Sequence, residues 1–203
     1  MNTVKRVLIT GCPRSGLSFL CQLLIDAGAS IGESTGTRKD KSYLENDRIR
    51  KELDSLLYLR RKSRITRKDV ISLKITFDKE VLESDSSVFV YKDPRLIYLY
   101  KIFDSLFHPE WVSVRRNEED TSNSCLHTGF MRGYSTTEEW TNWVSNFNLK
   151  SDALESNVDF ISTIRPTKVI NGDFTEIIDL LVRLGLDTNI DFEKYKSNTL
   201  WRV

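Results

Sequence analysis

The sequence predicts an α/β protein: a three-layer fold with a central, mainly parallel sheet, in a single domain that spans residues 1–203. Short apolar runs rich in β-branched residues alternate along the chain with amphipathic helical patterns. This alternation is typical of a parallel sheet covered by helices on both faces. No internal repeat or low-complexity linker divides the chain, and its 203 residues suffice for one sizeable core.

The strands are predicted from short apolar runs. Residues 4–10 form such a run with β-branched residues, which indicates a buried strand. Similar runs predict further strands at 88–92, 111–115 and 168–171. Ligands of parallel sheets bind beyond the carboxyl ends of the strands, so a motif that directly follows a strand is a candidate functional site.

The helices are predicted from apolar residues at helical spacing and from end signals. The expected ranges are 15–27, ending near Gly28, then 45–61, 96–107, 118–127, 136–157 and 175–184. Gly185 closes the last of these as a C-terminal cap.

Composition excludes several classes of protein. Lys and Arg number 30 against 29 Asp and Glu, so the net charge is +1 and no basic field indicates nucleic acid. The three cysteines form no C-x-x-C pair, which favours a reducing, cytoplasmic location. The two histidines, His108 and His127, are too far apart in sequence to indicate a metal site. No apolar run approaches the roughly 20 residues of a membrane helix, and the first strand begins too early for a signal peptide.

The strongest motif is GCPRSGLS, residues 11–18, between the first strand and the first helix. Gly11 and Gly16 are spaced as in the phosphate loop G-x-x-x-x-G-K-[ST], and Ser18 occupies the hydroxyl position, but Leu17 replaces the lysine. The glycines let backbone N–H groups approach an anion, and the helix adds its positive end. Arg14, which can bind two oxygens at once, supplies a cation. The motif therefore predicts a phosphate-binding loop.

The stretch GCPRSGLSFL resembles the 5′-phosphosulfate loop of sulfotransferases, x-P-[KR]-S-G-[TS]-[TS]-[WFL]-L. This resemblance implies a P-loop-like sulfotransferase architecture that uses 3′-phosphoadenosine-5′-phosphosulfate (PAPS) and releases 3′,5′-ADP. It also implies that the donor is bound by Arg14, Ser15, Gly16, Leu17 and Ser18. Leu17 departs from the family's threonine or serine and loses one side-chain hydrogen bond. Phe19 lies where the family often has an aromatic ring that stacks on adenine; the pattern is equally consistent with a core residue.

A second stretch, residues 111–124, is similar to the family's 3′-phosphate motif: a strand, R-N-x-x-D, and a serine eight residues after the arginine. Arg116, Asn117, Asp120 and Ser124 meet this spacing. The resemblance implies that Arg116 and Ser124 converge on the 3′-phosphate, whereas Asp120 is expected to cap the helix. Arg115 is expected on the opposite face of the strand; a register error of one residue would exchange the two arginines.

The stretch YKDPR ends the second strand and resembles the K-D-P of many bacterial and protein-tyrosine sulfotransferases. Lys92 aligns with the catalytic histidine of the cytosolic members. It is expected, with Arg14, to stabilise charge on the transferring group and the leaving oxygen. Pro94 should end the strand, and Asp93 should cap the next element of the chain. A surface ion pair between Asp93 and Arg95 is an equally open interpretation.

Glu33 is the predicted proton acceptor. Related glycolipid and tyrosine sulfotransferases carry a glutamate in the loop after the first helix, often as G-E, and Glu33 follows Gly32. A carboxylate near the acceptor hydroxyl could take its proton. His127, His108 and Asp93 stay as alternatives.

Residues 38–68 hold twelve Lys or Arg against five Asp or Glu, a local charge of +7. Such a run is usually a solvated helix face; it could also cover an anionic donor or contact an acidic acceptor. The R-K-G loop that closes over the 3′-phosphate in cytosolic members is absent, and residues 200–203 are its nearest replacement.

The predicted reaction is in-line transfer of the sulfuryl group from PAPS to a hydroxyl or amine of a small-molecule, glycan or peptide acceptor, with no metal. One alternative is an ATP- and magnesium-dependent phosphotransferase, disfavoured by the missing lysine and the lack of a second metal carboxylate. Another is a non-catalytic binder of 3′-phosphoadenosine nucleotides, or of an anionic polymer through residues 38–68.

Overall fold

A computed structural model describes residues 4–33 and 44–196, without the side chains of residues 160 and 161. Its strands are β1 (Lys5–Gly11), β2 (Val88–Lys92), β3 (Glu110–Val114) and β4 (Phe160–Ile164). They form one sheet in the order β2-β1-β3-β4, and every neighbouring pair is parallel. The next strand along the chain, β2, lies on one side of β1, and the strand after it, β3, lies on the other side. The direction in which successive strands are added therefore reverses at β1. Ligands of open parallel sheets bind at such a point.

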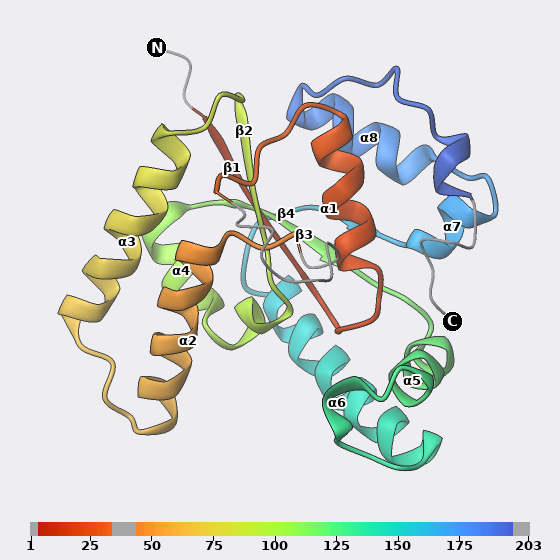
Figure 1. Cartoon of the computed structure of the whole chain (residues 1–203), viewed down its shortest axis with the longest axis horizontal. Coiled ribbons are helices and arrows are strands. Elements are labelled where there is room, and N and C mark those ends of the chain that lie inside the picture. The colour runs from red at the N-terminus through yellow and green to blue at the C-terminus, as the bar shows by residue number, and fades with distance from the viewer. Residues whose placement is uncertain (1–3, 34–43, 197–203) are drawn as a thin grey trace.

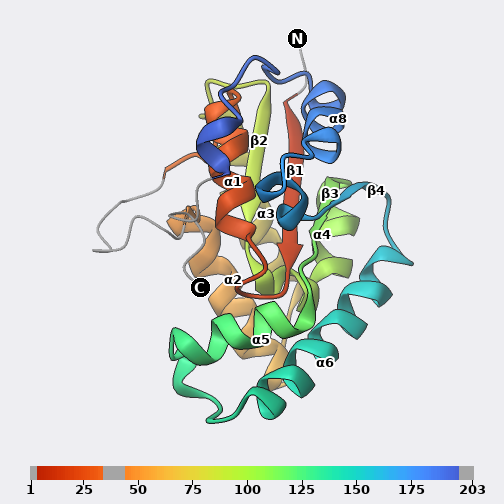
Figure 2. The same ribbon diagram turned by 90° about the vertical axis from the view of Figure 1, so that its right-hand side faces the viewer.

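Helices cover both faces of the sheet (Figures 1 and 2). One face carries α1 (Leu17–Asp26), α7 (Pro166–Ile170) and α8 (Thr175–Leu184). The other carries α2 (Asp47–Arg61), α3 (Arg67–Leu82), α4 (Tyr100–Phe107) and α6 (Thr137–Glu155). The remaining helix, α5 (Glu118–His127), lies beyond the end of β1 and packs on α6. The predicted three-layer α/β fold is confirmed.

Alternation along β1 produces the two cores. Val7 and Ile9 point to the α1 face, and Leu8 points to the α4 face; all three are fully buried. A buried strand of a parallel sheet must be apolar on both faces, which explains the continuous apolar run in the sequence. Over the described ranges, no helix combines the length and the apolar character that crossing a membrane requires.

The prediction of a strand at 168–171 is wrong. These residues belong to α7 and the turn after it, and the fourth strand lies earlier, at Phe160–Ile164. Pro166 is the reason, since it stands at the first position of α7. Its fixed φ suits that position, where a missing N–H costs nothing.

The helix α3 is not among the predicted helices, although the sequence carries its signals. Thr66 and Asp69 form a capping box at its start. Leu73, Phe77 and Val81 follow at intervals of one helical turn and are buried against the sheet.

Candidate functional site

The loop between β1 and α1 lies at the centre of the carboxyl edge of the sheet. A Cβ atom at Gly11 would collide with the carbonyl oxygen of Val114 on β3, so glycine allows the loop to approach that strand. Gly16 caps α1 with φ 107°, a conformation that other residues rarely adopt. Arg14 has φ 71° although it carries a side chain. Left-handed backbone at a non-glycine residue is often retained at functional sites.

The loop fits an anion. The hydroxyl of Ser15 is buried and has no hydrogen-bond partner among the described residues. Such a group carries an uncompensated desolvation cost, which a ligand oxygen would relieve. No side chain caps the N-terminus of α1, which leaves backbone N–H groups at its positive end. Leu17 packs in the core with 6% of its surface exposed, so its side chain points away from the loop.

The two motifs predicted to bind phosphates meet at Arg14. Its Nε donates a hydrogen bond to Oγ of Ser124 on α5, at 3.2 Å. Its carbonyl oxygen accepts one from Nη1 of Arg116, at 3.4 Å. Desolvation lowers the pKa of Arg116; Asp120 opposes this shift, and the charge of Arg14 adds to it. Two guanidinium groups held together in partly buried surroundings are suited to an anion.

Arg115 points the other way, as strand alternation predicts. Its guanidinium pairs with Asp152 at 2.6 Å and Glu155 at 2.7 Å, both on α6. It therefore joins β3 to α6, while Arg116 faces the loop.

The two predicted helix caps have different outcomes. Asp93 accepts from the N–H of Arg95 and caps the 3₁₀ helix η1 (Pro94–Tyr98), as predicted. Asp120 does not cap α5; that prediction is wrong. Asn117 caps α5 instead, since its side chain accepts from two backbone N–H groups of the first turn. The position directly before a helix is the one from which a short side chain reaches these groups.

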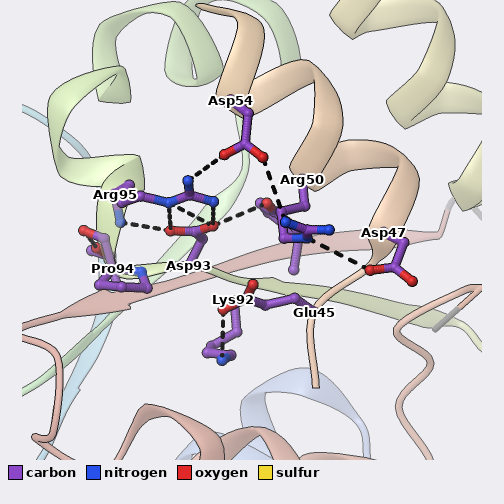
Figure 3. Close-up of polar contacts among 10 residues, drawn as sticks. Glu45, Asp47, Arg50, Asp54, Lys92, Asp93, Pro94 and Arg95 are labelled. Atoms are coloured by element: carbon purple, nitrogen blue, oxygen red, sulfur yellow. Dashed lines mark hydrogen bonds and ion pairs between the residues drawn. The ribbon is translucent and has the colours of Figure 1, made fainter. Parts of the chain in front are cut away.

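Lys92 reaches the loop from the neighbouring strand. It is the last residue of β2, pairs in register with Ile9 of β1, and is only 3% exposed. Its Nζ donates to Oγ of Ser18 at 3.4 Å. It also donates to Oε1 of Glu45 at 3.2 Å (Figure 3). The ammonium group of Lys92 therefore lies beside the first turn of α1. It brings a positive charge to this turn, where Leu17 stands in place of a lysine.

Glu45 is a site residue that the sequence did not indicate. It lies two residues before α2, and its side chain is 13% exposed. Desolvation raises its pKa, and the charge of Lys92 partly opposes that shift. A glutamate just before a helix is a common feature of protein sequences. The two residues in its contact with Lys92 are 47 positions apart in the sequence, so no local sequence pattern predicts that contact.

Asp93 is held on both of its oxygens. Arg95 Nε lies 2.9 Å from Oδ1, and Nη2 lies 2.7 Å from Oδ2. Arg95 also pairs with Asp54 on α2, so η1 and α2 are joined (Figure 3). The expected ion pair therefore forms, with Asp93 fully buried rather than at the surface.

The other predicted residues lie elsewhere. Glu33 is half-exposed, pairs with Arg48 of α2, and donates its N–H to Glu80 at 3.1 Å. His127 is exposed on α5. Within 4–33 and 44–196, no hydrogen bond or ion pair joins Glu33 or a histidine to Lys92.

Phe19 is 6% exposed and lies edge-on to Tyr195, with ring centroids 5.5 Å apart. The structure places it in the core, and stacking on adenine stays a prediction. The hypotheses for residues 38–43 and 200–203 concern segments outside the described residues.

No family model and no curated protein matches the sequence. The structure is similar to a solved one described as the sulfotransferase domain from the Synechococcus PCC 7002 olefin synthase, with a TM-score of 0.62. Sequence identity is 14%, over 100% of this chain and 81% of that chain. The fold is therefore sulfotransferase-like: a central parallel sheet flanked by helices, with the glycine-containing loop of residues 11–18 after its first strand.

Proposed function

We propose that this protein is a sulfotransferase, which transfers the sulfuryl group of PAPS to a hydroxyl or amine acceptor. The observation that supports this most is the contact of Arg14 with both Arg116 and Ser124. This contact brings together the two elements proposed to bind phosphates, on one edge of a sulfotransferase-like fold. A nucleotide with phosphates at the 5′ and 3′ positions of its ribose requires both elements.

Each residue then has a role set by its position. The hydroxyls of Ser15 and Ser18 and the N–H groups of α1 would hold the 5′-phosphosulfate. Arg116 and Ser124 would hold the 3′-phosphate. When bound, the donor supplies an activated sulfuryl group on a phosphate leaving group. Lys92 would stabilise the negative charge that grows on the bridging oxygen, and it acts most strongly in the transition state. The assignment of the base to Glu33 stays a prediction.

A thermal-shift experiment tests the proposed donor. At 100 times its dissociation constant, 3′,5′-ADP should raise the melting temperature by about 5–10 °C without magnesium. AMP at the same concentration should raise it much less, because it lacks the 3′-phosphate. Equal stabilisation by AMP, or stabilisation only by ATP with magnesium, would contradict the proposal and favour a phosphotransferase. Binding of 3′,5′-ADP without sulfuryl transfer from PAPS would indicate a non-catalytic binder.

A further inference from the structure

We propose that Glu45, rather than Glu33, accepts the proton of the acceptor in the reaction proposed above. The geometry that supports this role is the placement of the Glu45 carboxylate next to Lys92, which itself contacts the loop of residues 11–18. This inference rests on the proposed function and names a catalytic residue for the same site.

The contacts place Glu45 close to the loop proposed to hold the phosphosulfate. Lys92 Nζ lies 3.4 Å from Oγ of Ser18 and 3.2 Å from Oε1 of Glu45. Ser18 belongs to the loop that would hold the phosphosulfate, so one ammonium group separates this carboxylate from the transferring group. Among the described residues, only Oε1 accepts a hydrogen bond. The second oxygen, Oε2, is therefore available to a hydroxyl.

Two other candidate carboxylates among the described residues, Asp93 and Glu33, are paired with different cations. Asp93 has both oxygens held by Arg95 and is fully buried. Glu33 is paired with Arg48 and is half-exposed. Figure 3 shows the difference for the first of these: the Asp93 carboxylate is enclosed by Arg95, whereas Glu45 faces Lys92.

The surroundings of Glu45 favour proton uptake. Glu45 contacts Lys92 of β2. It also interacts electrostatically with Cys21 of α1, Tyr91 of β2, and Asp93 and Arg95 of the following turn. Desolvation raises its pKa, and Asp93 adds to the rise, against the charges of Lys92 and Arg95. A carboxylate whose pKa lies nearer to neutrality is the better general base.

The proposed step conserves atoms and electrons. The acceptor O–H bond breaks, and its proton moves to Oε2 of Glu45. The acceptor oxygen forms a bond to sulfur while the bond from sulfur to the bridging oxygen breaks. The electron pair of that bond stays on the 5′-phosphate of 3′,5′-ADP. Once protonated, Glu45 no longer neutralises Lys92, whose positive charge can then act on the departing oxygen. The proton leaves Glu45 to water after the product has gone.

The test compares Glu45→Gln and Glu45→Ala with variants of two other residues of the full chain. Glutamine keeps the shape and an oxygen that accepts from Lys92 but lacks the basicity of a carboxylate. Asp47→Asn is the matched control, because it removes a carboxylate two residues away that pairs with Arg50 rather than Lys92. Glu33→Gln tests the base predicted from the sequence. For each variant, 3′,5′-ADP binding is measured by calorimetry. Sulfuryl transfer from PAPS is measured to water and to phenols of graded acidity.

We expect Glu45→Gln to bind 3′,5′-ADP as well as the wild type or better, since a negative charge is removed. Its transfer rate should fall by roughly 10²–10⁴-fold. The deficit should shrink as the phenol becomes more acidic, because an acidic acceptor needs less help to lose its proton. The wild-type rate should rise with pH through an ionisation that is absent in Glu45→Gln. Asp47→Asn should match the wild type.

Two results would overturn the assignment of Glu45. One is full transfer by Glu45→Gln together with loss in Glu45→Ala, which would make Glu45 a positioning residue for Lys92. The other is loss of transfer in Glu33→Gln while Glu45→Gln remains active. A wild-type protein that binds 3′,5′-ADP but transfers no sulfuryl group would overturn the proposed function itself, a result separable from both of these.

Discussion

In the proposed function, Lys92 and Arg14 supply the positive charge that the lysine of a phosphate-binding loop usually provides. Lys92 comes from the adjacent strand and contacts Ser18, the residue that follows the missing lysine. Arg14 comes from within the loop and contacts α5. Leu17 is buried in the core, so a lysine there would lose its packing. In the proposed function, these two cations provide the positive charge that Leu17 lacks.

Arg116 should be selective for the 3′-phosphate. Replacing it with alanine should weaken 3′,5′-ADP binding by roughly 2–3 kcal/mol, the scale of a lost charge-assisted hydrogen-bond pair. Binding of AMP should change little. Isothermal calorimetry with both nucleotides measures the difference. Arg115→Ala is the control: it should lower stability through its lost pairs with α6 but keep the preference for 3′,5′-ADP. A similar loss for both nucleotides in Arg116→Ala would show that Arg116 supports the fold instead.

Lys92 should also stabilise the folded state in a pH-dependent way. Lys92→Met removes the partner of a carboxylate that is only 13% exposed, which should cost about 3 kcal/mol near neutral pH. Desolvation already raises the pKa of Glu45 above its ordinary 4.5, and loss of the lysine should raise it further.

A raised folded-state pKa contributes stability that is fully present below the unfolded value and is lost as the pH rises through the folded value. The stability of Lys92→Met should therefore fall steeply above pH 4.5. Urea denaturation across the pH range measures this. Adding Glu45→Gln should remove most of the slope; an unchanged slope in the double variant would mean that another group titrates.

At the scale of the elements, the sequence predicts features that are local. The strands β1 and β2 and the helices α5 and α8 lie within one residue of their predicted ranges, because apolar runs and end signals mark them. The error at 168–171 arises because Val169 and Ile170 look like part of a strand when Pro166 is overlooked. Spacing alone indicates the two phosphate motifs, but their meeting at Arg14 depends on the parallel pairing of β1 with β3. The contact of Glu45 with Lys92 is tertiary, so no helical or strand period could reveal it.

The turn between β1 and α1 gives a prediction at this scale. Gly11→Ala should push the loop away from β3, because a Cβ atom collides with the Val114 carbonyl. Overpacking of this kind costs typically about 1–3 kcal/mol, and nucleotide binding should fall with it. Gly133→Ala is the control, since its φ of −82° suits alanine and its Cβ would be 3.5 Å from Trp140, an ordinary contact. Chemical denaturation and 3′,5′-ADP binding measure both variants. Normal binding in Gly11→Ala would show that the close approach is not needed.

For the whole molecule, the site is assembled from the ends of three neighbouring strands. β1 supplies the loop, β2 supplies Lys92, and β3 supplies Arg116. The cluster is therefore only as rigid as the sheet beneath it, whose inner residues are fully buried. The segment just before α2 contributes Glu45, and α2 itself is joined to η1 by Asp54 and Arg95.

The sharing of Arg14 by both anion-binding elements has a thermodynamic consequence. Its side chain contacts α5, and its carbonyl contacts Arg116, so both ends of the nucleotide proposed to bind here would act on one residue. Occupancy at one end then changes the conformational freedom left for the other, and the two contacts are coupled rather than additive. A doubly phosphorylated nucleotide gains from this as a chelating ligand does, because its second contact is intramolecular. Removal of either phosphate would therefore weaken binding of the whole nucleotide. Hydrolysis of one phosphate of the product 3′,5′-ADP would favour its release.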